Sequence, residues 1–189
     1  SESFAITRTR ISRRRDAPKP LISMNELLTT TMSSPIGKLY ILARGTTVLG
    51  LNLSGFQDLL SSLSNKDLEE KIVKGRAIPG VTDLLENYFD GDLKAINSIA
   101  VKQPGGDFSQ RAWASMRKIK IGTMESYADL AYRAGSPAAV RAAGSACAKN
   151  KIAVIIPCHR IIKSGGAIGA YGWGVEKKKW LLRHEGAID

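Results

Sequence analysis

Residues 126–148 read SYADLAYRAGSPAAVRAAGSACA, a stretch that predicts two helices joined by a short turn. The first is expected over residues 126–132, where the hydroxyl of Ser126 can accept a hydrogen bond from the free backbone N–H groups of the first turn. Residues 134–136 form the turn, and the alanine-rich second helix is expected over residues 137–148. Two helices joined around a glycine are typical of a helix-turn-helix unit.

The second predicted helix carries little side-chain bulk on any face. The long side chain of Arg141 projects among small residues, which are Ala138, Ala139, Ala142, Ala143, Gly144, Ser145 and Ala146. Such a surface permits close approach of another backbone, either in tight helix packing or in a groove of DNA. In the second case Arg141 would enter the base stack as the wedges of minor-groove binders do. The residues alone leave both interpretations open.

Residues 152–162, IAVIIPCHRII, place a cysteine inside an apolar run. We predict a buried strand over residues 152–156, followed by the polar insert Pro157–Arg160. A cysteine in such a run is usually inert, but here His159 directly follows Cys158. A thiol with a pKa of about 8.5 needs a base or positive surroundings to become a nucleophile, and this segment offers both. The pattern therefore predicts a reactive thiol.

A histidine that acts as a base also needs an acceptor to orient it. Glu185 is the best placed acid of the C-terminal half, because it ends the apolar-periodic helix around Trp180-Leu181-Leu182. Its carboxylate is either turned inward near the core or solvated at the helix end, and spacing alone favours the solvated position. His184 is expected to lie at the surface or at the helix end.

Upstream of residue 107 the sequence predicts a separate unit with a small antiparallel sheet. A turn signal at residues 34–37 precedes strand candidates at residues 39–42 and 48–51, and an apolar helical period follows over residues 81–89. Gln103-Pro104-Gly105-Gly106 then interrupts the chain. We predict an α/β (α+β) protein made of a basic flexible arm over residues 1–22, an N-terminal α/β domain over 23–104 and a mostly helical C-terminal domain over 105–189.

Positive charge is concentrated in the C-terminal half. The whole chain has 28 Lys and Arg against 17 Asp and Glu, which gives a formal net charge of +11. Residues 107–189 hold fourteen basic and six acidic side chains, whereas residues 21–106 hold eight and nine. Such a field favours a polyanionic partner, nucleic acid ahead of an acidic protein.

Other classes of protein are disfavoured by the composition. The sequence has no run of about 18 apolar residues and no basic-then-apolar leader, so we expect an intracellular protein that does not engage a membrane. Two cysteines are too few for a disulfide framework. Because only two histidines accompany them, a closed zinc site is not expected, and we predict no metal and no other cofactor.

The chain resembles the methylated-DNA–protein-cysteine methyltransferases, also called alkylguanine-DNA alkyltransferases. The likeness rests first on Pro157-Cys158-His159-Arg160, and it covers roughly residues 34–187 in layout. From Phe108 onward it is specific, through Ser126-Tyr127, Val140–Gly144, Asn150, Ile156–Ile162, Gly169-Ala170-Tyr171 and Leu181–Gly186. Residues 146–151 look like the C-terminal repair domain of the bacterial adaptive-response protein. The resemblance implies a ribonuclease-H-like N-terminal domain and a helix-turn-helix in the C-terminal domain.

The resemblance also implies a reaction and its residues. An alkyl group is expected to pass irreversibly, once per protein molecule, from 6-O-alkylguanine in DNA, and from 4-O-methylthymine, to Cys158. His159 would relay the thiol proton through a water, and Glu185 would orient His159. Tyr127 would assist nucleotide flipping and protonate the departing guanine. Asn150 would tie the recognition helix to the cysteine loop.

By the same resemblance, the second predicted helix would contact double-stranded DNA. The protein is expected in the cytoplasm or nucleoid of a prokaryote or in the nucleus of a eukaryote, and no obligate protein partner is evident from the sequence. Arg141 would fill the place of the flipped nucleotide, flanked by Ala139, Ala142, Ala143, Gly144 and Ser145. The substrate pocket would be lined by Tyr127, Pro157, Ile161, Tyr171, Gly172 and Trp173, and the carbonyls of Cys158 and Ile161 would read the guanine. Since several relatives have glycine at the position of Trp173, we expect a pocket that favours methyl over benzyl-sized groups.

Two other functions could use the same residues. Cys158, His159 and Glu185 are the residue types of a cysteine hydrolase. Neighbouring side chains on a strand point to opposite faces, however, which argues against direct contact between the thiol and His159. A non-catalytic sensor would bind alkylated DNA without removing the lesion, and the intact set of three residues disfavours it.

Overall fold

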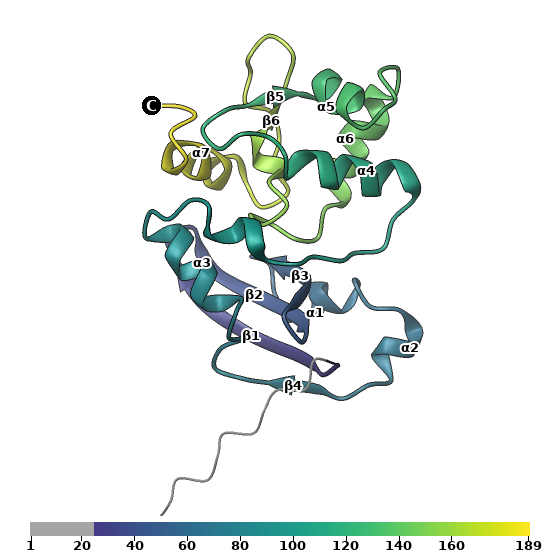
Figure 1. Ribbon diagram of the computed structural model, residues 1–189, viewed down its shortest axis with the longest axis vertical. Helices are drawn as coiled ribbons and strands as arrows, with labels where there is room; N and C mark the ends of the chain where they lie inside the picture. The colour runs from purple at the N-terminus through teal and green to yellow at the C-terminus, as the bar shows by residue number, and fades with distance from the viewer. Residues whose placement is uncertain (1–24) are drawn as a thin grey trace, which may run out of the picture.

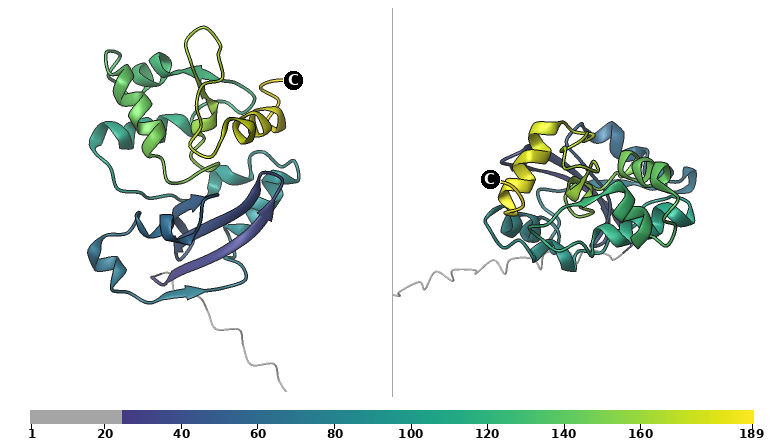
Figure 2. Two further views of the ribbon diagram at one scale, coloured as in Figure 1. Left: turned by 180° about the vertical axis from the view of Figure 1, so that it is seen from behind. Right: turned by 90° about the horizontal axis from the view of Figure 1, so that it is seen from above.

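Residues 25–106 form a sheet covered by short helices. The computed structural model describes residues 25–189, so the predicted arm over residues 1–22 lies outside the described part of the chain. The strands are β1 (Leu27–Ser34), β2 (Gly37–Arg44), β3 (Thr47–Asn52) and β4 (Ile72–Lys74). The helices are α1 (Phe56–Leu60), α2 (Asn65–Leu68), α3 (Thr82–Phe89) and the short 3-10 helix η1 (Ala95–Ser98). Helix α3 lies against one face of the sheet (Figures 1 and 2).

The predicted turn and strands are confirmed, but the sheet is not purely antiparallel. Its strand order is β3-β2-β1-β4, and β1 pairs antiparallel with β2 through the turn between Ser34 and Gly37. Strand β3 is also antiparallel to β2, whereas β4 runs parallel to β1. The prediction of an antiparallel sheet is therefore wrong for β4. Parallel pairing needs a long connection, and the segment that carries α1 and α2 provides it.

Residues 107–189 form the helical half, so the protein is a mixed α/β fold. Its elements are α4 (Asp107–Met116), β5 (Glu125–Ser126), α5 (Tyr127–Arg133), α6 (Val140–Lys149), the 3-10 helix η2 (Cys158–Arg160), β6 (Ile161–Ile162) and α7 (Val175–His184). The predicted cap of α5 is confirmed, because the Ser126 hydroxyl accepts from the backbone N–H of Asp129. Helix α6 begins later than predicted, at Val140 rather than residue 137, with Ala139 as its N-cap. No helix within residues 25–189 is long and apolar enough to cross a membrane.

One cluster of buried apolar side chains runs through both halves. It includes Ile41 of β2, Leu85 of α3, Trp113 of α4 and Ile155 before η2. Backbone hydrogen bonds also connect the two halves. Leu51 N donates to the carbonyl of Lys151 at 2.9 Å, and Ala153 N donates to the carbonyl of Leu51 at 2.9 Å. The cysteine loop is thus fastened to β3 at the edge of the sheet. The domain boundary near residue 104 stays a prediction.

The segment before the cysteine is buried, but it is not the predicted strand. Within residues 152–156 only Ile152 forms a bridge, with Leu51, and tight turns follow, in which Ile155 N donates to the carbonyl of Ala153 at 2.7 Å. Val154 has a φ of 69°, which is costly for a β-branched residue. An apolar run reports burial, and it does not separate a strand from a buried turn. These turns end in η2, which presents Cys158.

Candidate active site

Cys158 is held at the start of η2 by a side chain from the end of α6. Its side chain is buried, with 6% of the residue exposed. Asn150, the C-cap of α6, donates from Nδ2 to Cys158 Sγ at 3.3 Å and to the carbonyl of Ile156 at 3.0 Å. The predicted tie between the helix and the cysteine loop is therefore present in the geometry.

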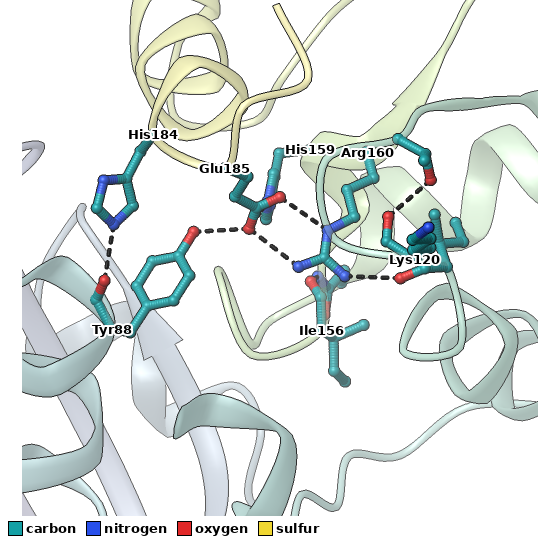
Figure 3. A network of polar contacts seen from close by, with 10 residues as sticks. Tyr88, Lys120, Ile156, His159, Arg160, His184 and Glu185 are labelled. Atoms are coloured by element: carbon teal, nitrogen blue, oxygen red, sulfur yellow. Dashed lines mark hydrogen bonds and ion pairs between the residues drawn. The ribbon is translucent and has the colours of Figure 1, made fainter. Parts of the chain in front are cut away.

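The Glu185 carboxylate contacts four hydrogen-bond donors, and Figure 3 shows those of Tyr88 and Arg160. His159 Nε2 lies 3.0 Å from Oε2, and Tyr88 donates its hydroxyl to the same oxygen at 2.7 Å. Arg160 donates from Nε to Oε1 at 2.8 Å and from Nη2 to Oε2 at 2.9 Å. Glu185 follows α7 as its C-cap and is buried, so its carboxylate lies inward and not in the solvated position that spacing alone favours.

The contact with Glu185 fixes the role of each ring nitrogen of His159. A carboxylate can only accept, so a neutral His159 carries its proton on Nε2 and leaves Nδ1 as an acceptor. Nδ1 is fully buried and has no hydrogen-bond partner among the described residues. Its lone pair is therefore available as a base.

The resting charge states follow from burial and from these contacts. Burial raises the pKa of the Cys158 thiol, and the Asn150 hydrogen bond and the charge of Lys178 oppose that rise. Burial also lowers the pKa of His159, against the pull of Glu185. Burial by itself would raise the pKa of Glu185, but the contacts with His159 and Arg160 hold it well below its usual range. The site at rest thus holds a protonated thiol, a neutral imidazole and an ionised carboxylate.

Lys178 of α7 is a buried cation near the thiol that the sequence analysis missed. Its Nζ donates to the carbonyl of Ile161 at 2.6 Å and to that of Ala170 at 3.2 Å, so it clamps the two sides of the loop between β6 and α7. The available signal was a lysine three residues before Leu181, on the apolar face of the predicted helix. The Ile161 carbonyl keeps a second lone pair beside this bond.

The predicted pocket residues surround the cysteine loop with different exposures. Pro157, Ile161 and Tyr171 are buried, Tyr127 and Trp173 are half-buried, and Gly172 is exposed. The Tyr171 hydroxyl is buried without a partner in the described chain, and the ring of Trp173 meets that of Tyr171 edge-on at 5.2 Å. Trp173 also lines a cavity of about 320 Å³ that reaches Asn150 and the sheet half. Burial is the main cause that raises the pKa of Tyr127, so its hydroxyl stays protonated.

Helix α6 presents some of its small residues outward and buries others. Arg141 and Ser145 are exposed, and Ala142 and Gly144 are half-buried. Arg141 has no hydrogen bond or ion pair with any of residues 25–189. Ala143 is fully buried, which corrects its assignment to the DNA-contacting surface, because its side chain packs into the core. Ala139, half-buried, precedes the helix as its N-cap.

Tyr88 and Gln103 were not predicted as residues of the site, and His184 is less exposed than expected. Tyr88 reads as one apolar position of α3, and its tie to Glu185 joins residues far apart in the chain. His184 ends α7 as predicted, but its ring stacks on Trp180 and its Nε2 lies 2.7 Å from the Tyr88 carbonyl. No local pattern indicates either contact.

Replacement of Tyr88 by phenylalanine is expected to cost about 1.5–3 kcal/mol of unfolding free energy, the usual range for a hydrogen bond to a charged group. The Glu185 carboxylate would lose one donor in a buried site. Tyr171→Phe is the matched control, because the buried Tyr171 hydroxyl has no partner in the described structure, and its removal is expected to cause no loss of stability. Urea unfolding of both variants makes the comparison, and equal losses would contradict this assignment of Tyr88.

The stability of the protein is expected to fall as the pH drops below about 6.5, the usual pKa of histidine in an unfolded chain. Because the folded state lowers the pKa of His159, the unfolded chain binds a proton there first, at a cost of up to about 1.4 kcal/mol per pH unit. Glu185, whose folded pKa is depressed, adds to the loss below about pH 4.3. Unfolding free energies between pH 5 and 8 measure the slope, and His159→Gln should flatten it. An unchanged slope in that variant would rule out His159 as the source.

Comparison with known proteins identifies the family of the chain. A family model described as the DNA-binding domain of 6-O-methylguanine DNA methyltransferase matches residues 107–187. The methylated-DNA–protein-cysteine methyltransferase of Salmonella typhimurium is 32% identical over 169 residues, which are 87% of this chain and 99% of that protein. The protein of that name from Haemophilus influenzae is 33% identical over 86% of this chain and 88% of its own. A crystal structure of Mycobacterium tuberculosis OGT in complex with DNA is 32% identical and superposes with a TM-score of 0.70 over 85% of this chain and 93% of that one. The chain therefore belongs to the methylated-DNA–protein-cysteine methyltransferase family.

Proposed function

We propose that the protein repairs alkylated DNA by transferring an alkyl group from guanine to Cys158. The observation that carries this proposal is one buried site that joins a thiol, a histidine with an unpartnered ring nitrogen and an ionised glutamate. The Salmonella typhimurium relative, which this chain matches over 99% of that protein's length, is named a methylated-DNA–protein-cysteine methyltransferase. The positive field of the helical half supplies attraction for DNA.

In the proposed reaction the thiol proton passes through a water to His159 Nδ1, and Glu185 stabilises the imidazolium that forms. The sulfur attacks the saturated alkyl carbon from the side opposite the guanine oxygen. As the new carbon–sulfur bond forms, the carbon–oxygen bond breaks, and the protonated Tyr127 hydroxyl donates to the departing guanine. The products are unmodified guanine and a thioether at Cys158. Because a thioether is stable, each protein molecule reacts once.

The proposed approach to DNA uses α5 and α6 as a helix-turn-helix. Arg141 is exposed and unpaired within the described chain, and its neighbours Ala142, Gly144 and Ser145 offer little bulk, which suits entry into a groove. The alkyl carbon lies inside the duplex, so the nucleotide must leave the stack at a cost of a few kcal/mol. Arg141 would fill the gap that this nucleotide leaves. We therefore propose that the partner is double-stranded DNA that carries the lesion, in the cellular compartment that contains the DNA.

Two finer features of the fold belong to the same proposal. The strand order β3-β2-β1-β4, with β4 parallel to β1, supports a ribonuclease-H-like sheet half. The change of charge near residue 106 supports a boundary between two domains there. The shared core makes these domains one cooperative unit, so a single unfolding transition is expected.

Trp173 is expected to restrict the range of alkyl groups. Its ring packs edge-on against Tyr171 of the proposed pocket. Replacing Trp173 by glycine should raise the rate of benzyl transfer relative to methyl transfer by roughly tenfold, the usual size of a steric discrimination. Transfer rates from methylguanine and benzylguanine in the same duplex provide the measurement, with the methyl rate of each protein as its own reference. Equal methyl and benzyl rates in the unsubstituted protein would contradict the restriction.

The function is tested by mixing the protein with duplex DNA that carries one 6-O-methylguanine and measuring the intact mass of the protein. A single added methyl group, absent in Cys158→Ala, is the expected result. Binding without a mass change would favour a sensor instead. Repeated turnover on an ester would favour a hydrolase, which uses the same three residue types.

A further inference from the structure

Gln103 lies in the segment that joins the two halves, and its buried side chain reaches the residue that holds the thiol. Only 5% of Gln103 is exposed. Its Nε2 donates to Asn150 Oδ1 at 2.9 Å, and its Oε1 accepts from the backbone N–H of Lys151 at 2.9 Å. Gln110 of α4 in turn donates to the Gln103 carbonyl at 2.7 Å. Both ends of the Gln103 amide are therefore used, and its backbone is fixed from a neighbouring helix.

The bonds to Asn150 determine which way its amide faces. Asn150 Oδ1 accepts from Gln103 Nε2 and from the backbone N–H of Ile152 at 3.1 Å. Nδ2 then faces the carbonyl of Ile156 and Cys158 Sγ. A reversed amide would set its oxygen against that carbonyl, which repels it, and would leave no N–H group pointing at the sulfur. It would also leave Gln103 Nε2 facing a second N–H group, with no acceptor.

We propose that Gln103 is a positioning residue for the transfer reaction, holding the Asn150 amide so that an N–H group points at Cys158 Sγ. This role rests on the proposed function for its chemistry, because the sulfur carries negative charge as it attacks the alkyl carbon. A hydrogen bond to a charged group is stronger than one to a neutral group, so the donor gains strength as the thiolate forms. Gln103 does not touch the thiol, and it acts only through Asn150.

The environment of the thiol determines how the loss of Gln103 should change the pKa of Cys158. Burial raises the pKa of Cys158, and the hydrogen bond from Asn150 is the first of the contacts that lower it. Without Gln103 the Asn150 amide has one donor fewer to hold its oxygen. The thiolate then becomes harder to form, and the reactivity of Cys158 should move to higher pH.

The experiment compares Gln103→Glu and Gln103→Met with Gln110→Met in the full chain. Glutamate keeps the size of Gln103 and still accepts from Lys151 N, but it has no N–H for Asn150 Oδ1. Methionine keeps the bulk and removes both bonds without adding charge. Gln110→Met is the matched control, because it removes the hydrogen bond to the Gln103 carbonyl in the same segment, and Gln110 makes no hydrogen bond to Asn150.

The readout is the rate at which a small methanethiosulfonate reagent modifies Cys158 as a function of pH, with peptide mapping to separate it from Cys147. For both Gln103 variants we expect the midpoint to move up by about one pH unit, with a roughly tenfold slower reaction at neutral pH. Gln110→Met should keep the midpoint of the unsubstituted protein. An unchanged midpoint in a folded Gln103 variant, or an equal shift in Gln110→Met, would overturn the proposal.

This measurement uses no DNA and no alkylguanine. A protein with the expected thiol profiles but no methyl transfer would therefore refute the proposed function and leave the contact between Gln103 and Asn150 in place. Melting temperatures of the three variants, recorded alongside, identify a folded sample. If glutamate prevents folding, the uncharged methionine variant alone gives the answer.

Discussion

Replacement of Glu185 by glutamine is expected to lower the free energy of unfolding by about 3–5 kcal/mol, the cost of breaking a buried ion pair from one side. Arg160 would keep its charge in a site where 2% of its side chain is exposed, facing an amide in place of a carboxylate. An amide nitrogen cannot accept from Tyr88, His159 and Arg160, so at least one buried donor loses its partner.

The same change is expected to slow alkyl transfer by roughly 10²-fold or more, within the usual contribution of a positioned general base. Without the carboxylate, the imidazolium of His159 is no longer stabilised, and Nε2 is no longer held as the protonated nitrogen. Denaturant unfolding and single-turnover transfer measure the two effects.

Glu176→Gln is the control for Glu185, because it changes a glutamate in the first turn of the same helix. Glu176 is largely exposed, and its one ion pair within residues 25–189 is with Lys179 at 3.6 Å. Its replacement should alter stability by less than about 0.5 kcal/mol and leave transfer unchanged. If Glu185→Gln matched this control in both measurements, the network around Glu185 would have no part in stability or reaction.

Arg141→Ala is expected to slow repair of duplex DNA by roughly 10²-fold while leaving the reaction with free 6-O-methylguanine base nearly unchanged. Flipping the nucleotide costs a few kcal/mol of stacking energy, which the Arg141 side chain would offset by filling the gap. Each 1.4 kcal/mol of this stabilisation that is lost slows the reaction about tenfold. Free base needs no flipping, so the network beneath Cys158 would act on it as before.

The control for Arg141 is Lys149→Ala, which removes an exposed positive charge from the other end of α6. It should weaken duplex binding modestly and to a similar degree for damaged and undamaged DNA, since a phosphate contact carries no sequence information. Equal losses on duplex and free base in Arg141→Ala would contradict the role in flipping.

Local signals in the sequence predicted much of the fold. Ser126 begins α5 because its hydroxyl and the carboxylate of Asp129 satisfy the free N–H groups of that helix end, a pattern visible in the residues. The turn at Ser34 and Gly37 is equally local. Two features were not predicted, the buried turns over residues 152–156 and the parallel strand β4. Each depends on a distant segment, because Ile152 bridges to Leu51 and β4 pairs with β1.

The site also contains residues that the sequence indicated and residues that it did not. Cys158 and His159 are neighbours in sequence, and the resemblance added Glu185 and Asn150. In the structure Asn150 contacts Cys158, and Glu185 contacts His159. Tyr88 meets Glu185 across 97 residues, and Gln103 meets Asn150 across 47. Contacts of that span leave no periodicity or motif in a single sequence, so only the folded chain shows them.

We propose that Cys158 accepts one alkyl group and keeps it. Titration of a fixed amount of protein with excess duplex DNA carrying 6-O-methylguanine, followed by counting of repaired lesions and by peptide mapping, provides the measurement. We expect a plateau at one repaired guanine per protein molecule, with the methyl group on the peptide that contains Cys158. Repair that continues beyond one lesion per molecule, or a methyl group found on Cys147 instead, would contradict it.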